Sequence, residues 1–237
     1  MAVPDAVTTY GSVSFLFPLS LMAGEWGESK VFLEHTHRLF GSLVGLVTLL
    51  VAAWTWRIER RSHVRIFALA VFLLVTTQGI LGALRVSENS AVLAMLHGMF
   101  GQAVFASAVL LAAVLATGAA LRESTIPRPT LRAARVGFKL SVAAIACVGL
   151  QLAFGAASRH LGADHATWSH AVFAFVVAAV VGATCRALRS SDRLSSTGQR
   201  LRLIGAALVA CISVQFLLGF VVLWQVSEPE AQRPIVE

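Results

Sequence analysis

The chain has 237 residues, of which 57% are hydrophobic and only 13% are charged, and its formal net charge is +7. Soluble domains contain roughly a quarter charged residues. This composition, with a mean hydropathy of +0.77, therefore excludes an ordinary soluble domain. The positive charge does not indicate a nucleic-acid partner, because the basic residues gather in three loops between apolar runs.

Six apolar runs follow one another along the chain, and each is long enough to cross a bilayer as a helix, which takes about 20 residues. They cover residues 34–56, 66–85, 92–121, 136–156, 166–186 and 202–224. The runs are too long for strands or for ordinary core helices. The sequence therefore predicts an all-α, polytopic membrane helical bundle.

The loops between these runs differ strongly in charge. Three alternate loops, at 57–65, 122–139 and 186–202, hold 14 of the 19 Lys and Arg residues and 3 of the 12 acidic residues. This asymmetry predicts that the basic loops face the cytoplasm and that both ends of the chain face outward. The first residues do not resemble a signal peptide, so we expect a further helix before the first run.

A short motif, Gln-x-x-x-Gly, recurs in the second, fourth and sixth runs, at Gln78, Gln151 and Gln215. His97 follows Gln78 by 19 residues, and His170 follows Gln151 by 19. Equal spacing indicates duplication of a helix pair. Two readings of the glutamines stay open, which are hydrogen bonds between helices and a role at the edge of a bound ligand.

The repeat also predicts a longer parent structure. By the same spacing, a further histidine-bearing helix is expected near Pro234, close to the end of the chain. We therefore expect six helices of an eight-helix, pseudo-symmetric parent, which would consist of two four-helix bundles. The expected boundary between the two halves divides the chain into residues 1–121 and 122–237.

Three histidines lie just inside the same end of their apolar runs, namely His37, His97 and His170. Ionisable residues inside a membrane are costly and usually mark function. Two imidazoles on facing helices can ligate a heme iron from both sides, and Gly98 and Gly101 beside His97 would leave room for the macrocycle. For each histidine, the alternative is a polar side chain that a neighbouring helix satisfies.

Glu34 lies one helical turn before His37, on the same face of the helix. Next to a heme edge, this carboxylate would move protons or stabilise positive charge that develops on a substrate. Arg38 would pair with a heme propionate. The alternatives are an interfacial carboxylate and an arginine whose charge reaches the membrane surface.

The other candidate residues indicate structure more than chemistry. His35 is expected to point away from His37. His160 and His165 lie in an outer loop and are expected to be mostly solvated, and with Asp164 they do not make a convincing zinc site, which needs a tight cluster of ligands. The cysteines have no CxxC spacing and are expected to be small packing residues. They are Cys147, Cys185 and Cys211.

The segments EHTHRLFGSLVGLVTLL, LHGMFGQ and WSH, together with the Gln-x-x-x-Gly helices, resemble the heme A synthase (CtaA-type) family. The resemblance covers essentially the whole chain, as six of that family's eight helices. It implies a membrane enzyme that oxidises the C8 methyl of heme O to a formyl group. The product, heme A, serves the assembly of terminal oxidases.

The resemblance also implies a role for each site residue. His37 and His97 correspond to the histidine pair assigned to the substrate heme in the first half of the chain. His170 corresponds to one ligand of a heme b in the second half, and Glu34 to a glutamate required for activity. The second heme b ligand has no counterpart here, so we expect the eight-helix parent to be active and this chain alone to lack activity.

The same resemblance implies the bacterial cytoplasmic membrane, with the histidines near its outer face. The implied partners are heme O, heme O synthase and a terminal oxidase, and a homo-oligomer stays open. The electron donor and the source of oxygen are not indicated.

Two other classes of protein are alternatives to this assignment. A membrane cytochrome b-type electron-transfer subunit would share the histidine pairs but would not need Glu34. A transporter is disfavoured, because transporters place broken helices and charges at the membrane midplane, whereas the centres of these runs are apolar.

Overall fold

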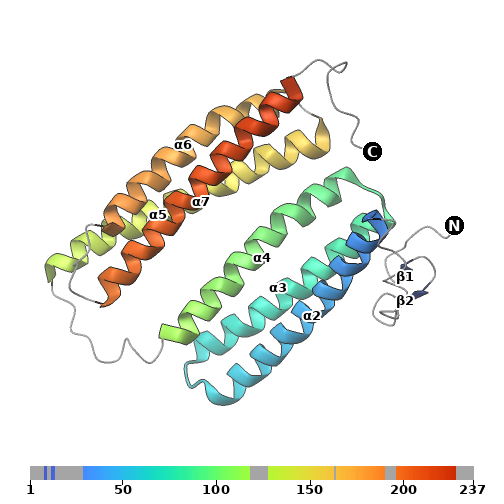
Figure 1. The fold of residues 1–237 in the computed structure, drawn as a ribbon. Helices are drawn as coiled ribbons and strands as arrows, with labels where there is room; N and C mark the ends of the chain where they lie inside the picture. Colours follow the sequence, from blue (N-terminus) through green and yellow to red (C-terminus); the bar gives the residue numbers. More distant parts are fainter. Residues whose placement is uncertain are drawn as a thin grey trace. The chain divides into compact units, whose positions relative to one another are not determined.

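The computed structural model describes residues 8–9, 12–13, 29–117, 128–162, 164–189 and 196–227. Within these residues, six helices are long and apolar enough to cross a membrane, which confirms the prediction of an all-α membrane bundle (Figure 1). The helices are α2 (Ser29–Ile58), α3 (Ser62–Ser87), α4 (Ala91–Thr117), α5 (Arg128–Leu161), α6 (Asp164–Arg189) and α7 (Ser196–Ser227). Outside them, β1 (Thr8–Thr9) pairs antiparallel with β2 (Ser12–Val13).

The chain divides into two compact units, Met1–Ser124 and Thr125–Glu237. In the first unit α3 packs against both α2 and α4, and in the second α6 packs against both α5 and α7. Each unit thus has a middle helix that neighbours both of the others (Figure 1).

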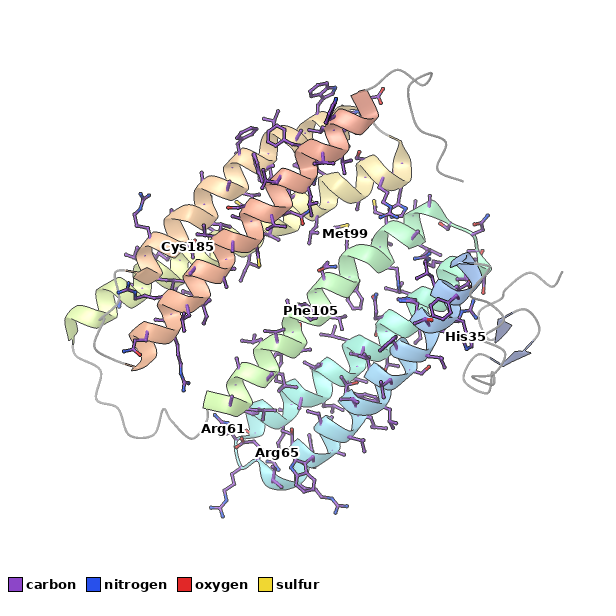
Figure 2. All side chains as sticks on the ribbon, viewed as in Figure 1. His35, Arg61, Arg65, Met99, Phe105 and Cys185 are labelled. Carbon is purple, nitrogen blue, oxygen red and sulfur yellow. The ribbon has the colours of Figure 1, made fainter. Side chains whose placement is uncertain are left out.

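Small side chains bring the helices together in both units. In the first, Ala68 and Val71 of α3 are buried against Leu111 of α4. In the second, Val177, Val181 and Cys185 of α6 form the buried cluster, and Cys185 is labelled among the packed side chains in Figure 2. Small residues allow the close approach on which association of membrane helices depends, because lipid gives no hydrophobic drive between helices.

Most large apolar side chains point away from the helix contacts. Phe105, Trp54 and Ile145 are examples that are well exposed on the outside of their units. In a soluble protein this exposure would be unfavourable, but in a bilayer these side chains meet lipid. The outward hydrophobicity is therefore part of the reason that the chain belongs in a membrane.

The hairpin turns use residues suited to tight reversals. Asn89 between α3 and α4 and Gly162 between α5 and α6 have φ values of 45° and 60°, a left-handed conformation that Asn and Gly adopt most readily. Between α2 and α3, Arg61 donates to both carboxylate oxygens of Glu59. Arg65 lies 5.4 Å from the ring centre of Trp56, so a cation–π contact joins these two helices.

The predicted spans agree with the observed helices, which extend a few residues beyond most of them. Residues 118–121, the end of the third predicted run, lie outside the described residues. The sequence did not indicate the environment of His35, whose side chain is fully buried.

We predict that Ala68→Leu destabilises the first unit by about 1 to 3 kcal/mol, because a larger side chain overpacks the contact with Leu111. Unfolding in a denaturing detergent titration measures this loss. Ala106→Leu is the matched control, since Ala106 is exposed on α4. Equal stability of the two variants would contradict the packing of α3 on α4.

We also predict a pH-dependent contribution from Glu59. Hydrogen bonds from Arg61 lower the pKa of Glu59 from its ordinary 4.5 to about 2. The ion pair therefore stabilises the α2–α3 turn fully above pH 4.5, and this stabilisation is lost as the pH falls to about 2. The stability difference between the wild type and Glu59→Gln should shrink over that window. This difference in stability should be small at every pH, because water reaches the pair. A difference that is constant with pH would contradict the pairing.

Candidate functional site: a histidine held by each helical hairpin

Gln78 of α3 holds the histidine of α4. The side-chain nitrogen of Gln78 donates to the backbone carbonyl of His97 at 3.0 Å, and the same nitrogen lies 3.5 Å from His97 Nε2. His97 is the seventh residue of its helix, where one turn of the helix is already formed. The predicted spacing of 19 residues thus becomes a direct contact across the hairpin.

Two glycines make room for this contact. A Cβ atom added to Gly82 would lie 3.0 Å from His97 Cε1, and one added to Gly101 would lie 2.9 Å from the side-chain nitrogen of Gln78. Gly101 was predicted to leave room for a macrocycle, but the amide of Gln78 takes that space. Gly98 has nothing within 4 Å of the position of its Cβ.

The hairpin of α5 and α6 repeats the arrangement. The side-chain nitrogen of Gln151 donates to the backbone carbonyl of His170 at 3.0 Å. His170 is again the seventh residue of its helix, and a Cβ on Gly155 would lie 2.9 Å from His170 Cε1. Of the two open readings of the glutamines, the geometry favours the hydrogen bond between helices.

The third copy of the motif, in α7, has no such contact within the residues that the structure describes. Gln215 is exposed, and nothing lies within 4 Å of the Cβ position of Gly219. The motif alone therefore does not produce the contact, which requires a histidine on the helix opposite.

In the first unit a second histidine approaches His97. The ring centroids of His37 and His97 are 6.3 Å apart, and the ring planes are at 81°. Two imidazoles on opposite sides of one metal ion, each bonded through nitrogen at about 2 Å, have centroids roughly 6 Å apart. The observed centroid distance matches this value, and it also lies within the ordinary range for two rings in edge-to-face contact. His37 is exposed, so the pair can be reached from outside the helices.

Glu34 and Arg38 pair with each other on α2. One guanidinium nitrogen of Arg38 donates to a carboxylate oxygen of Glu34 at 2.6 Å. An ion pair is the usual state of opposite charges in the membrane, where an isolated charge is expensive. Both residues lie on the helix that carries His37: Glu34 is one turn before it, and Arg38 is the next residue along the chain.

The other candidate residues from the sequence do not lie in this site. His165 and Asp164 are exposed and His160 is half-buried. No group of three or more His, Cys, Asp or Glu side chains suited to a metal ion is found in the described part of the chain. The structure also adds a feature that sequence patterns did not indicate, an open apolar groove of about 430 Å³ on the α5–α6 hairpin, and His170 is not among its lining residues. The groove is lined by Phe154, Trp168, Ser169, Val172, Phe173 and Val176.

We predict that Gly101→Ala destabilises the α3–α4 hairpin by about 1 kcal/mol, the typical worth of one hydrogen bond between membrane helices. The added methyl group would displace the amide of Gln78 from the carbonyl of His97. Gly98→Ala is the control, because its Cβ meets nothing within 4 Å. Detergent unfolding of both variants measures the difference, and an unchanged Gly101→Ala protein would contradict the role of this bond.

The sequence of this chain is similar to those of known proteins. The family model described as cytochrome oxidase assembly protein, COX15-CtaA, matches residues 17–169. Heme A synthase of an Exiguobacterium species is 31% identical over 140 residues, which are 58% of this chain and 44% of that protein. Heme A synthase of Halalkalibacterium halodurans is 29% identical over 121 residues, 49% of this chain and 38% of that protein.

A third relative, heme A synthase of Shouchella clausii, is 36% identical over 84 residues, 35% of this chain and 28% of that protein. The matched part of the chain thus spans less than half the length of these relatives. No solved structure matches. The family match covers well over half of the chain and includes both hairpin glutamines, His37 and His97, and it ends one residue before His170. The chain therefore belongs to the COX15-CtaA family of cytochrome oxidase assembly proteins.

Proposed function

We propose that this chain is the heme-handling part of a heme A synthase, which converts heme O to heme A. The observation that carries the proposal is the His37–His97 pair, whose rings are spaced to suit one iron between them. The curated relatives bear the name heme A synthase. The reaction oxidises the C8 methyl group of heme O to a formyl group, and the product is used in the assembly of a terminal oxidase.

Three histidines are proposed to bind heme. His37 and His97 hold the substrate heme in the first unit, and His170 is one ligand of a resident heme b in the second. The residues present fit these groups. His97 and His170 are half-buried and held against glycines, and the hairpin that carries His170 also has an open apolar groove. A bound heme b would supply electron transfer.

Glu34 and Arg38 would act at the edge of the substrate. Arg38 now balances the charge of Glu34 at 2.6 Å. A propionate that approaches Arg38 would compete for the guanidinium, weaken this pair and leave Glu34 free to accept a proton. The two residues would thus link substrate binding to the availability of a base.

The site is proposed to lie near the outer face of a bacterial cytoplasmic membrane. In the first unit, His35 lies near one end of the helices, while Arg61 and Arg65 lie at the opposite end (Figure 2). Basic residues favour the cytoplasmic side, which puts the histidine end on the outer side. Heme O synthase would supply the substrate and a terminal oxidase would receive the product, and assembly into a homo-oligomer stays open.

The test is heme binding and conversion in a host that makes heme O. We expect purified protein to carry heme O or heme A, identified by its pyridine hemochrome spectrum. His37→Ala and His97→Ala should lose that heme, because each removes one side of the pair. His160→Ala is the control, since His160 lies outside the pair. Retention of the heme in both site variants would contradict the proposed substrate site.

Glu34→Gln separates an enzyme from an electron carrier, which is the other function that a histidine pair serves. We expect this variant to retain heme O and to form no heme A, because the glutamine keeps the shape of the side chain but cannot accept a proton. Glu59→Gln is the control, since it removes a carboxylate at the far end of α2. Unchanged product formation in Glu34→Gln would contradict the catalytic role. Bound heme b alone, insensitive to His37 and His97, would indicate an electron-transfer subunit.

A further inference from the structure

The ring of His170 is held by α5 at both of its nitrogen atoms. His170 Nδ1 lies 3.0 Å from the backbone carbonyl oxygen of Gln151, and His170 Nε2 lies 3.4 Å from the side-chain nitrogen of Gln151. A carbonyl oxygen only accepts hydrogen bonds, so Nδ1 carries the hydrogen of the neutral ring. The second nitrogen, Nε2, is left with its lone pair.

The orientation of the Gln151 amide supports this assignment. Its nitrogen donates to the backbone carbonyl of His170 at 3.0 Å, which fixes the amide with its NH₂ group towards the histidine. The NH₂ group donates and cannot accept, so the nearby Nε2 of the ring has to be the acceptor. At 3.4 Å this second contact is long for a hydrogen bond, and a stronger partner of the lone pair would replace it easily.

Gly155 is what allows the ring to lie in this position. A Cβ atom there would be 2.9 Å from His170 Cε1 and 3.1 Å from His170 Nδ1. Side chains are essentially never found so close, so any residue other than glycine would push the ring away from the carbonyl of Gln151. The motif Gln-x-x-x-Gly thus supplies both the acceptor for Nδ1 and the space for the ring.

The corresponding site in the first unit differs at one atom. Gln78 and Gly82 contact His97 at nearly the same distances as their counterparts in the second unit. However, the buried Nδ1 of His97 has no hydrogen-bond partner among the residues that the structure describes. Both ring nitrogens of His170 are therefore held, whereas His97 is held at its backbone carbonyl and at one ring nitrogen only.

We propose that Gly155 is a positioning residue that, together with the backbone carbonyl of Gln151, locks His170 in the Nδ1–H tautomer and presents its Nε2 to a heme iron, whereas His97 lacks this lock. The proposal rests on the proposed function, since it assigns the two histidines to hemes. A histidine that donates its second ring N–H to a carbonyl is a better-oriented and more basic metal ligand. The locked site suits a heme that stays, and the unlocked site suits one that enters as substrate and leaves as product.

The first experiment needs no heme. The ¹⁵N spectrum of the histidine side chains of the heme-free chain reports which ring nitrogen carries hydrogen, and the His170 signals are identified by their loss in His170→Ala. We expect His170 to be Nδ1–H in the wild type and in Gly149→Ala, since nothing lies within 4 Å of the Gly149 Cβ position. Gly155→Ala should give a mixture of tautomers. A wild-type His170 that carries its hydrogen on Nε2 would overturn the proposal.

If Gly155→Ala does not fold, the wild-type spectrum still shows whether the hydrogen of His170 is on Nδ1. Gln151→Leu provides a further check, because it removes the amide but keeps the backbone carbonyl that holds Nδ1. We expect His170 to stay Nδ1–H in this variant. A merely structural role of the hairpin contact would lower the stability of Gly155→Ala without a change of tautomer. An unchanged tautomer in a folded Gly155→Ala protein would therefore contradict the lock.

The second experiment uses the heme-loaded chain. Gly155→Ala should lower heme affinity at His170 by about 10- to 100-fold, the usual effect of losing a residue that orients a metal ligand, and should make the reduction potential of that heme more positive. Gly149→Ala should match the wild type in both properties. Equal potentials in the two variants would overturn the proposal. A chain that binds no heme would contradict the proposed function, and the heme-free spectrum would still decide the lock.

Discussion

A polar group inside a bilayer has to find its partner within the protein, because lipid offers none. Two hairpins of this chain meet that constraint in the same way. Each uses one glutamine amide to reach the backbone carbonyl of a histidine on the next helix, at 3.0 Å in both cases. The backbone of the histidine, and not only its ring, is therefore tied to the neighbouring helix, which fixes the register of the hairpin.

The hydrogen bond from the glutamine to the histidine backbone determines where small residues are needed. Because the glutamine and the histidine ring lie between the helices, the residues facing them have to be glycine, as Gly82, Gly101 and Gly155 are. Elsewhere in the hairpins, glycines such as Gly79 and Gly149 have free space at the Cβ position. Glycines of the first kind are structural requirements of the site. Those of the second kind reflect only the tolerance of membrane helices for glycine.

Much of this arrangement could be predicted from the sequence, because the relevant signals run along the chain. Hydropathy located six helices, and the equal spacing of 19 residues indicated the repeated helix pair in which Gln78 and Gln151 contact their histidines. Contacts that depend on which helices neighbour one another were not predicted. The burial of His35 and the filling of the Gly101 space by Gln78 follow from rotamers and tertiary neighbours, which a linear pattern does not contain. The pairing of Arg38 with Glu34 is local to α2, four residues apart, and depends on the rotamers of the two side chains.

The two units also differ in the charges they bring to their histidines. Among the described residues, both ion pairs lie in the first unit, and one of them, Glu34–Arg38, flanks His37 on α2. The described part of the second unit has no ion pair, and its α5–α6 hairpin has an open apolar groove instead. Under the proposed function, a paired carboxylate in the unit whose His97 lacks the lock would suit chemistry on a ligand that exchanges. An apolar surface in the unit with the oriented His170 would suit a group that stays in place and passes electrons. The duplicated hairpin would thus supply one framework with different surroundings for a reactive site and a carrier site.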